Sequence, residues 1–302
     1  MSNKEKCFSD SQDSKGSNPM LWAAPLLAIL ISWFFHQFGE METEAVITLG
    51  IAIWTALWWI FEAVPIPIAS LLPLSLLPLF GVLSPKVVGE KFGHPLVPLL
   101  FGGFLLSKAM ERSGAHKRIA LLMVNACPSG EKFLILGFMI ATAFLSMWIS
   151  NTATTLMMLP MALAVIQGSR NHQLTIPLLL GIAFAANVGG IGTPIGTPPN
   201  LVMIGAYADL GYPELSFSKW MKFGVPVTII MVLVIWLWLS RGITGNKKIS
   251  LPHPGNWRVA EVRTLLVFGL TALAWITRSE PFGGWKTWLD LPNANDASVV
   301  FI

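Results

Sequence analysis

The sequence has 302 residues, of which 54% are hydrophobic and 12% are charged, and its formal net charge is +4. A soluble domain carries about a quarter charged residues, so this composition excludes an ordinary soluble protein and indicates an all-α, polytopic membrane protein. The positive charge does not indicate nucleic-acid binding, because the basic residues lie between apolar segments. Cys7 and Cys127 have no spacing typical of a disulfide framework or a metal site.

The first twenty residues are polar and basic, with lysines at positions 4, 6 and 15. The apolar run that follows has no convincing cleavage site, so residues 1–20 are expected to be a disordered leader before a retained helix. The positive-inside rule places this leader in the cytoplasm. We therefore expect a multi-pass protein of the cell inner (plasma) membrane with a cytoplasmic N-terminus.

Successive apolar runs then alternate in direction across the bilayer. The early crossings are expected at 21–38, 45–62, 64–83 and 95–110. Residues 115–127 are basic and short, which favours an amphipathic helix on the cytoplasmic membrane surface. Later crossings are expected at 220–240 and 262–277.

The segment 133–167 carries no charge and lies between Lys132 and Arg170. It is too long for one crossing of about 20 residues and short for two, and both flanks are basic. These features predict a re-entrant helical hairpin whose tip falls near Ser150-Asn151-Thr152. Irregular backbone at that depth is tolerated only where protein shields it or a cavity adjoins it, so the tip is a candidate site.

The segment 174–209 is predicted to be a crossing with a broken centre. Glycines and prolines crowd its middle, at positions 189, 190, 192, 194, 196, 198 and 199. Proline removes a backbone donor and clashes with the preceding turn, so two half-helices should meet around 189–200. The last apolar stretch, 297–302, is too short to cross a bilayer, so we expect the sequence to be a fragment of a longer chain.

Hydroxyl and amide side chains gather in the predicted hairpin at Ser146, Ser150, Asn151, Thr152, Thr154 and Thr155. Neutral oxygens suit a hard cation such as sodium, while amide, hydroxyl and backbone N–H groups can donate to a carboxylate. The alternative is that small polar residues let helices pack closely in lipid, and it stays open for Thr154 and Thr155. For Asn151 a functional role is favoured, because an unpaired amide in hydrocarbon is costly.

The run from Asn187 to Asn200, NVGGIGTPIGTPPN, contains the tripeptide GTP twice. Discontinuous transporter helices use freed carbonyls for sodium and helix N-termini for anionic groups. A proline kink without a ligand is the alternative; a nucleotide-phosphate loop lacks its strand and lysine. The loop candidates are Gly192, Thr193, Gly196, Thr197, Pro198 and Asn200.

The five histidines fall at predicted helix ends or in loops, and no paired metal-ligand motif occurs. Glu62, beside Pro65, is interpreted as an interfacial carboxylate rather than a buried coupling residue. The chain is therefore not expected to be an enzyme, although a polytopic membrane enzyme and a channel remain alternatives.

The SNT tip and the GGIGTPIGTPPN break, together with EAVPIPIASLLPL at 62–74 and FGGFLLSKAMERSGAHKRIAL at 101–121, resemble the divalent anion:sodium symporter family, of the bacterial sodium/dicarboxylate type. The resemblance implies an inverted-repeat fold in which each repeat supplies one hairpin and one broken helix. It casts 21–131 as scaffold-type helices and 132–210 as transport elements. Residues 211–302 would hold further helices and the start of a truncated second repeat.

The resemblance also implies residue roles. Ser146, Ser150 and Asn151, with loop carbonyls near Gly196, would hold one sodium ion, and Asn151 with Thr152 would contact substrate. The second SNT hairpin would lie beyond Ile302, and the full-length protein would be a homodimer.

The expected function is sodium-coupled transport of small dianions, C4-dicarboxylates in the first place, by elevator-type or rocking alternating access. No cofactor is expected; sodium ions would be the coupling ions, and the other partners are the dianion and membrane lipid. Sulfate, citrate or another oxyanion with different ion coupling is the alternative substrate.

Overall fold

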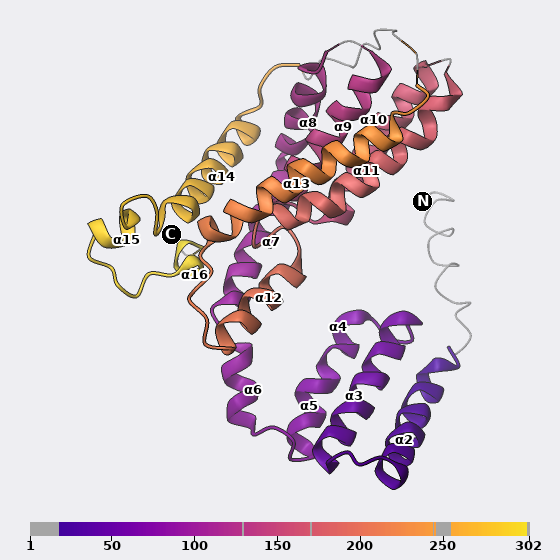
Figure 1. Cartoon of the computed structure of the whole chain (residues 1–302). Coiled ribbons are helices and arrows are strands. Elements are labelled where there is room, and N and C mark those ends of the chain that lie inside the picture. The colour runs from indigo at the N-terminus through magenta and orange to yellow at the C-terminus, as the bar shows by residue number, and fades with distance from the viewer. Residues whose placement is uncertain (1–17, 129, 170, 244, 246–254, 301–302) are drawn as a thin grey trace, which may run out of the picture. The chain divides into compact units, whose positions relative to one another are not determined.

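The computed structural model describes residues 18–128, 130–169, 171–243, 245 and 255–300. Over these residues the chain is helical and contains no strand (Figure 1). Most of the predicted leader lies outside the described residues. The chain divides into two compact units, one ending at Gly93 and the other starting at His94.

In its described residues, 18–93, the first unit consists of a helix pair and three shorter helices. They are α2 (Met20–Phe38), α3 (Thr43–Ile60), α4 (Ile66–Ala69), α5 (Leu71–Leu79) and α6 (Pro85–Phe92). Helices α2 and α3 pack closely where Gly50 faces Ser32, because a side chain at Gly50 would collide with the Ser32 hydroxyl. That hydroxyl donates a hydrogen bond of 3.3 Å to the Val46 carbonyl, which fixes the pair.

The crossing predicted over 64–83 differs from the structure, which has two short helices, α4 and α5, in its place. Prolines at positions 65, 67, 73 and 78 start, interrupt or end them, since proline cannot donate to the preceding turn. Residues 66–79 span roughly 20 Å as helix, less than a hydrocarbon core of about 30 Å.

The second unit is a larger helical assembly that contains both predicted irregular segments. Its helices are α7 (Leu96–Ser113), α8 (Ala115–Asn125), α9 (Glu131–Ser146), α10 (Asn151–Gly168), η1 (His172–Leu174), α11 (Thr175–Gly189), η2 (Gly190–Gly192), α12 (Pro198–Asp209), α13 (Phe217–Leu239), α14 (Val259–Thr277), α15 (Gly284–Trp288) and α16 (Asp296–Val299).

Among the described residues, five helical segments are long and apolar enough to cross a membrane: α2, α3, α11 with η2, α13 and α14. They correspond to five of the predicted crossings. Helix α7 has the length of a crossing but carries Lys108, Glu111 and Arg112 in its last turns. The arms of the predicted hairpin, α9 and α10, have 16 and 18 residues. The chain is a multi-pass, all-α membrane protein.

Helices α9, α11 and α13 pack against one another and form the centre of the second unit (Figure 1). Small residues allow the close approach: a Cβ at Gly181 of α11 would lie 3.1 Å from Cγ of Met139, and one at Gly189 would collide with the Ala143 backbone. Without a hydrophobic driving force between helices in lipid, such close packing supplies much of the association energy.

A left-handed glycine separates α7 from α8. Gly114 has a φ of 80°, a conformation that costs little only for glycine, and it ends one helix and begins the next. Helix α8 covers most of the amphipathic helix predicted at 115–127: it exposes Lys117 and buries Ala120 and Val124, but Arg118 of the basic face is buried as well.

A buried ion pair joins α8 to α14. Arg118 Nε lies 2.8 Å from Glu261 Oε2, and both side chains are less than a tenth exposed. The guanidinium also donates to the carbonyls of Gly255 and Asn256, and it lies over the Trp257 ring at 4.5 Å. Every nitrogen of the guanidinium therefore has a partner, which a buried charge requires.

Candidate functional site

The tip of the hairpin is the four-residue turn between α9 and α10. Helix α9 ends at Ser146, and α10 begins at Asn151. Ser150 is the N-cap of α10, and its hydroxyl accepts a hydrogen bond of 3.2 Å from the Ala153 amide. Serine at this position satisfies one of the amides that a helix start leaves unpaired, so the sequence itself defines where the second arm begins.

The break in the other predicted segment lies between Gly189 and Pro198, where α11 ends and α12 begins. Proline at the first position of α12 suits a helix start, because its missing N–H would have no partner there. Inside the break, the buried Asn200 donates from Nδ2 to the carbonyls of Gly190 and Thr193, at 2.8 Å each. This amide holds the break in one shape.

The two interruptions meet. The Thr193 hydroxyl, in the break, donates a hydrogen bond to the Met147 carbonyl in the hairpin turn. A Cβ at Gly190 would lie 2.8 Å from Asn151 Oδ1, and one at Gly196 would lie 3.0 Å from the Met147 carbonyl oxygen. Glycine at these positions lets the backbone of the break lie directly against the tip.

Oxygen atoms cluster at this junction. The Ser146 hydroxyl is buried, and its Oγ lies 2.7 Å from Asn151 Oδ1 and 2.6 Å from the Ala186 carbonyl oxygen. A serine hydroxyl carries one proton, so it can donate fully to only one of these acceptors at a time. Asn151 Nδ2 faces Asn187 Oδ1 at 3.4 Å, which points the Asn151 oxygen toward Ser146. A hard cation prefers such neutral oxygens as ligands.

Side chains donate hydrogen bonds to several carbonyls at the end of α11 and in the break, where the sequence predicted free carbonyls. The carbonyls of Ala186 and Val188 accept from Ser146 and Thr228, and that of Ile191 accepts from Trp220. No local pattern indicates the contributions of Thr228 and Trp220, because they lie on α13 in an ordinary apolar run. Asn187 lies at the start of the run 187–200, but its contact with the Asn151 side chain is not predictable from the sequence.

The remaining predicted residues lie around the junction. Thr193 and Asn200 are buried and tie the loop together, and Gly192 packs against the Met147 side chain. Thr197 is the N-cap of α12 without a side-chain cap bond, and Pro198 is exposed. The structure does not place these last two within the oxygen cluster.

Ser150 and Thr152 are exposed, and neither side chain is one of the groups that form the oxygen cluster. They line a cavity of about 730 Å³ whose opposite wall comes from α7 and α8. The two threonines whose role was open also differ: the Thr155 hydroxyl donates to the Asn151 carbonyl at 2.8 Å, whereas the buried Thr154 hydroxyl has no hydrogen-bond partner among the described residues.

Aromatic stacking holds the hairpin turn. Trp148 stacks on Phe217 at the start of α13, and Phe217 stacks on Trp275 of α14. Beside this stack, Arg278 is almost fully buried and pairs with Asp296 at 2.6 Å and with Glu214 at 2.7 Å. The aromatic stack and the neighbouring ion pairs therefore hold the turn in position.

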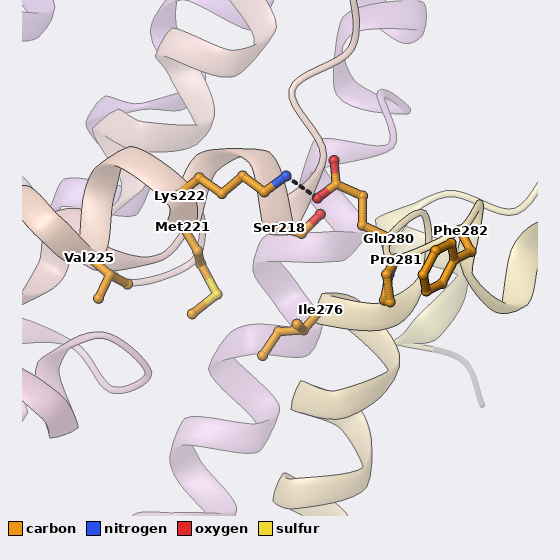
Figure 2. Close-up of a pocket in the computed structure, with 8 residues that line it drawn as sticks. All are labelled: Ser218, Met221, Lys222, Val225, Ile276, Glu280, Pro281 and Phe282. Atoms are coloured by element: carbon orange, nitrogen blue, oxygen red, sulfur yellow. Dashed lines mark ion pairs between the residues drawn. The ribbon is translucent and has the colours of Figure 1, made fainter.

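A second hollow, of about 670 Å³, lies between α13 and the segment after α14 (Figure 2). Lys222 and Glu280 form an ion pair across it, and Met221, Val225 and Ile276 line it with apolar surface. It contains none of the residues that the sequence singled out.

Among the described residues, no titratable side chain belongs to the oxygen cluster. This cluster consists of a hydroxyl, an amide and backbone carbonyls, and within the described part of the chain no three His, Cys, Asp or Glu side chains form a metal-binding group. Glu62 lies in the first unit, where it is exposed after α3.

A hairpin turn and a broken helix that meet inside a multi-pass helical protein are the architecture of a secondary transporter. Residues 56–289 match the family model described as citrate transporter (CitMHS), and the chain belongs to this family. The family consists of transporters, not enzymes.

Two similar relatives are both described as sodium-dependent dicarboxylate transporter SdcS. The protein from Staphylococcus aureus strain bovine RF122 / ET3-1 is 38% identical over 307 residues, and that from strain NCTC 8325 / PS 47 is 37% identical over 307 residues. Each alignment covers 94% of this chain and 58% of the relative. The chain thus spans somewhat more than half the length of the curated relatives that it matches.

Proposed function

We propose that this chain forms part of a sodium-coupled symporter of small dianions, with C4-dicarboxylates as the substrate class. The observation that carries the proposal is the group of three neutral oxygens at the junction: Ser146 Oγ, Asn151 Oδ1 and the Ala186 carbonyl. Only one hydroxyl proton is available to these three oxygens, so some of their lone pairs remain free to coordinate a sodium ion. The name of the two relatives supports the same ion and substrate class.

Electrostatics supports an ordered mechanism. No Lys or Arg occurs between 133 and 169, so a dianion at the tip has no fixed positive charge within the hairpin itself. A bound sodium ion and the N-terminus of α10 would supply the compensating charge. Sodium therefore binds first in this proposal, and Asn151 and Thr152 then donate to a substrate carboxylate. Ser150 shapes the sodium site by capping α10 beside Asn151.

The proposal extends to the moving parts. The hairpin and broken helix, residues 132–210, would act as transport elements against scaffold helices 21–131, by elevator or rocking motion, in a homodimer of the full-length protein. The leader would be cytoplasmic, in the plasma membrane. Close packing of the tip against the break supports movement of these two segments as one element.

The test is uptake of labelled succinate by protein reconstituted in proteoliposomes, with an inward sodium gradient or an equal potassium gradient. Sodium-dependent uptake that Asn151→Ala abolishes is expected. Competition with unlabelled sulfate and citrate identifies the preferred anion. Uptake that needs no sodium, or that keeps its sodium dependence in Asn151→Ala, would contradict the proposal.

A further inference from the structure

The cavity beside the hairpin tip has two chemically different walls. One wall carries the hydroxyl side chains of the first turns of α10, Thr152 and Thr154, together with the cap residue Ser150. The opposite wall comes from α7 and α8 and carries the cations Lys108 and Lys117. The oxygen cluster does not include any of these side chains, so the cavity is a separate space next to it.

The charge of this cavity is concentrated on Lys117. Lys108 is paired with Glu111 on the same helix, with Nζ 2.7 Å from Oε2, so their charges largely cancel. Lys117 is exposed to the cavity, and no acidic side chain among the described residues pairs with it. Its neighbour His116 is buried and bonds the Met110 carbonyl at 2.7 Å. The cavity therefore holds one uncompensated positive charge.

A threonine whose hydroxyl has no partner among the described residues is part of the lining of the same cavity. Thr154 is 1% exposed, and its hydroxyl has no hydrogen-bond partner within the described part of the chain. Buried hydroxyls almost always have a partner, because leaving one unpaired is costly. Thr142, on the other arm, shows the usual solution: its hydroxyl donates to the Phe138 carbonyl of its own helix, at 2.6 Å. Thr154 does not adopt that solution.

We infer that this cavity is a docking site for one carboxylate of a dianion, with Lys117 as its cation and Thr154 as a hydroxyl donor. The inference rests on the proposed function and adds a fixed charge to it. A dianion that reaches Thr152 with one carboxylate can place its other carboxylate in the cavity. The N-terminus of α10, whose cap Ser150 also lines the cavity, adds favourable potential for an anion there.

The experiment compares sodium-driven succinate uptake by the wild type and by Lys117→Gln in vesicles of phosphatidylcholine alone. Removing the charge is expected to raise the KM for succinate about tenfold and to leave the half-saturating sodium concentration nearly unchanged. Lys117→Arg keeps the charge and is expected to restore the KM. Lys86→Gln removes an exposed lysine of the first unit and is the matched control. A KM within about twofold of wild type in Lys117→Gln would overturn the inference.

A second pair of variants tests the hydroxyl. Thr154→Val keeps the shape and removes the donor, and it is expected to raise the KM for succinate; Thr142→Val, which removes a hydroxyl satisfied by its own helix, is expected to leave it unchanged. Equal effects in both variants would overturn the role of Thr154.

Two further outcomes separate the alternatives. If the effect of Lys117→Gln occurs only in vesicles that contain phosphatidylglycerol, Lys117 binds a lipid phosphate and the carboxylate site is overturned. If the wild type shows no sodium-dependent uptake, the proposed function fails, and the inference fails with it. Normal wild-type uptake with an unchanged KM in Lys117→Gln contradicts the inference alone.

Discussion

Trp148, in the hairpin turn, stacks on Phe217 at the start of α13, with ring centroids 5.9 Å apart and ring planes 20° apart. Phe217 in turn stacks on Trp275, at 5.1 Å and 6°. The turn that carries the polar tip is thus fixed by three aromatic side chains from three separate segments. This stack therefore helps to fix the position of the tip.

Trp148→Ala is expected to lower the free energy of unfolding by about 3–5 kcal/mol, because it leaves a cavity and removes the stack. Thermal unfolding in detergent measures the loss. Trp22→Ala removes an exposed tryptophan and serves as the control. A double-mutant cycle with Phe217→Leu should give a coupling of about 1 kcal/mol, and strictly additive effects would show that the stack contributes nothing beyond burial.

Ser146→Ala removes one oxygen of the junction cluster without adding volume. If this oxygen binds sodium, the half-saturating sodium concentration for uptake should rise by roughly tenfold or more. Thr142→Val is the control on the same helix, because that hydroxyl is already bonded to its own helix. Unchanged sodium dependence in Ser146→Ala, with intact protein, would remove Ser146 from the sodium site.

Gly196→Ala places a methyl group against the Gly190 and Met147 carbonyl oxygens. The break must then move away from the tip, and uptake should fall to background even where the protein still folds. Gly269→Ala is the control, because a Cβ there meets no atom within 4 Å. Size-exclusion profiles separate loss of transport from loss of folding, and normal uptake by Gly196→Ala would contradict the close packing.

Burial lowers the pKa of His116 below its ordinary value of 6.5, and the neighbouring Lys117 acts in the same direction. The bond to the Met110 carbonyl and the charge of Glu111 oppose these effects. Between the lowered pKa and 6.5, the unfolded chain binds a proton here that the folded chain does not. The contribution of His116 to the free energy of unfolding is therefore fully present above pH 6.5 and is lost as the pH falls through this window.

Unfolding temperatures measured from about pH 7.5 down to about pH 5 check this expectation. His116→Asn keeps a donor for the Met110 carbonyl but cannot titrate, so its unfolding temperature should fall less on acidification. An identical decline in both proteins would show that His116 does not contribute.

The sequence predicted the fold class, the main crossings and the two irregular segments because each depends on local chemistry. An uncharged run of 133–167 and a cluster of glycines and prolines at 189–199 are readable without tertiary information. The Ser150 cap also fixes the start of α10 locally. The resemblance to a transporter family agrees with the match to the citrate transporter family.

Other features depend on contacts between distant segments, and no local pattern predicts them. Thr228 and Trp220 pair with carbonyls of the break 40 and 29 residues away, and neither stands out in an apolar helix. The prediction of one crossing over 64–83 was wrong, because it rested on the hydrophobicity of the segment and not on its four prolines. The roles of Asn151, Thr152 and Gly196 toward ligands stay predictions.

The Arg118–Glu261 pair joins residues 143 positions apart in the chain. Pulling α8 away from α14 would leave two buried charges stranded, and breaking such a pair costs about 3–5 kcal/mol. Helices α8 and α14 should therefore move together as one unit. In the proposed alternating-access motion, a hairpin that moves would therefore move against both helices together and not against α8 alone.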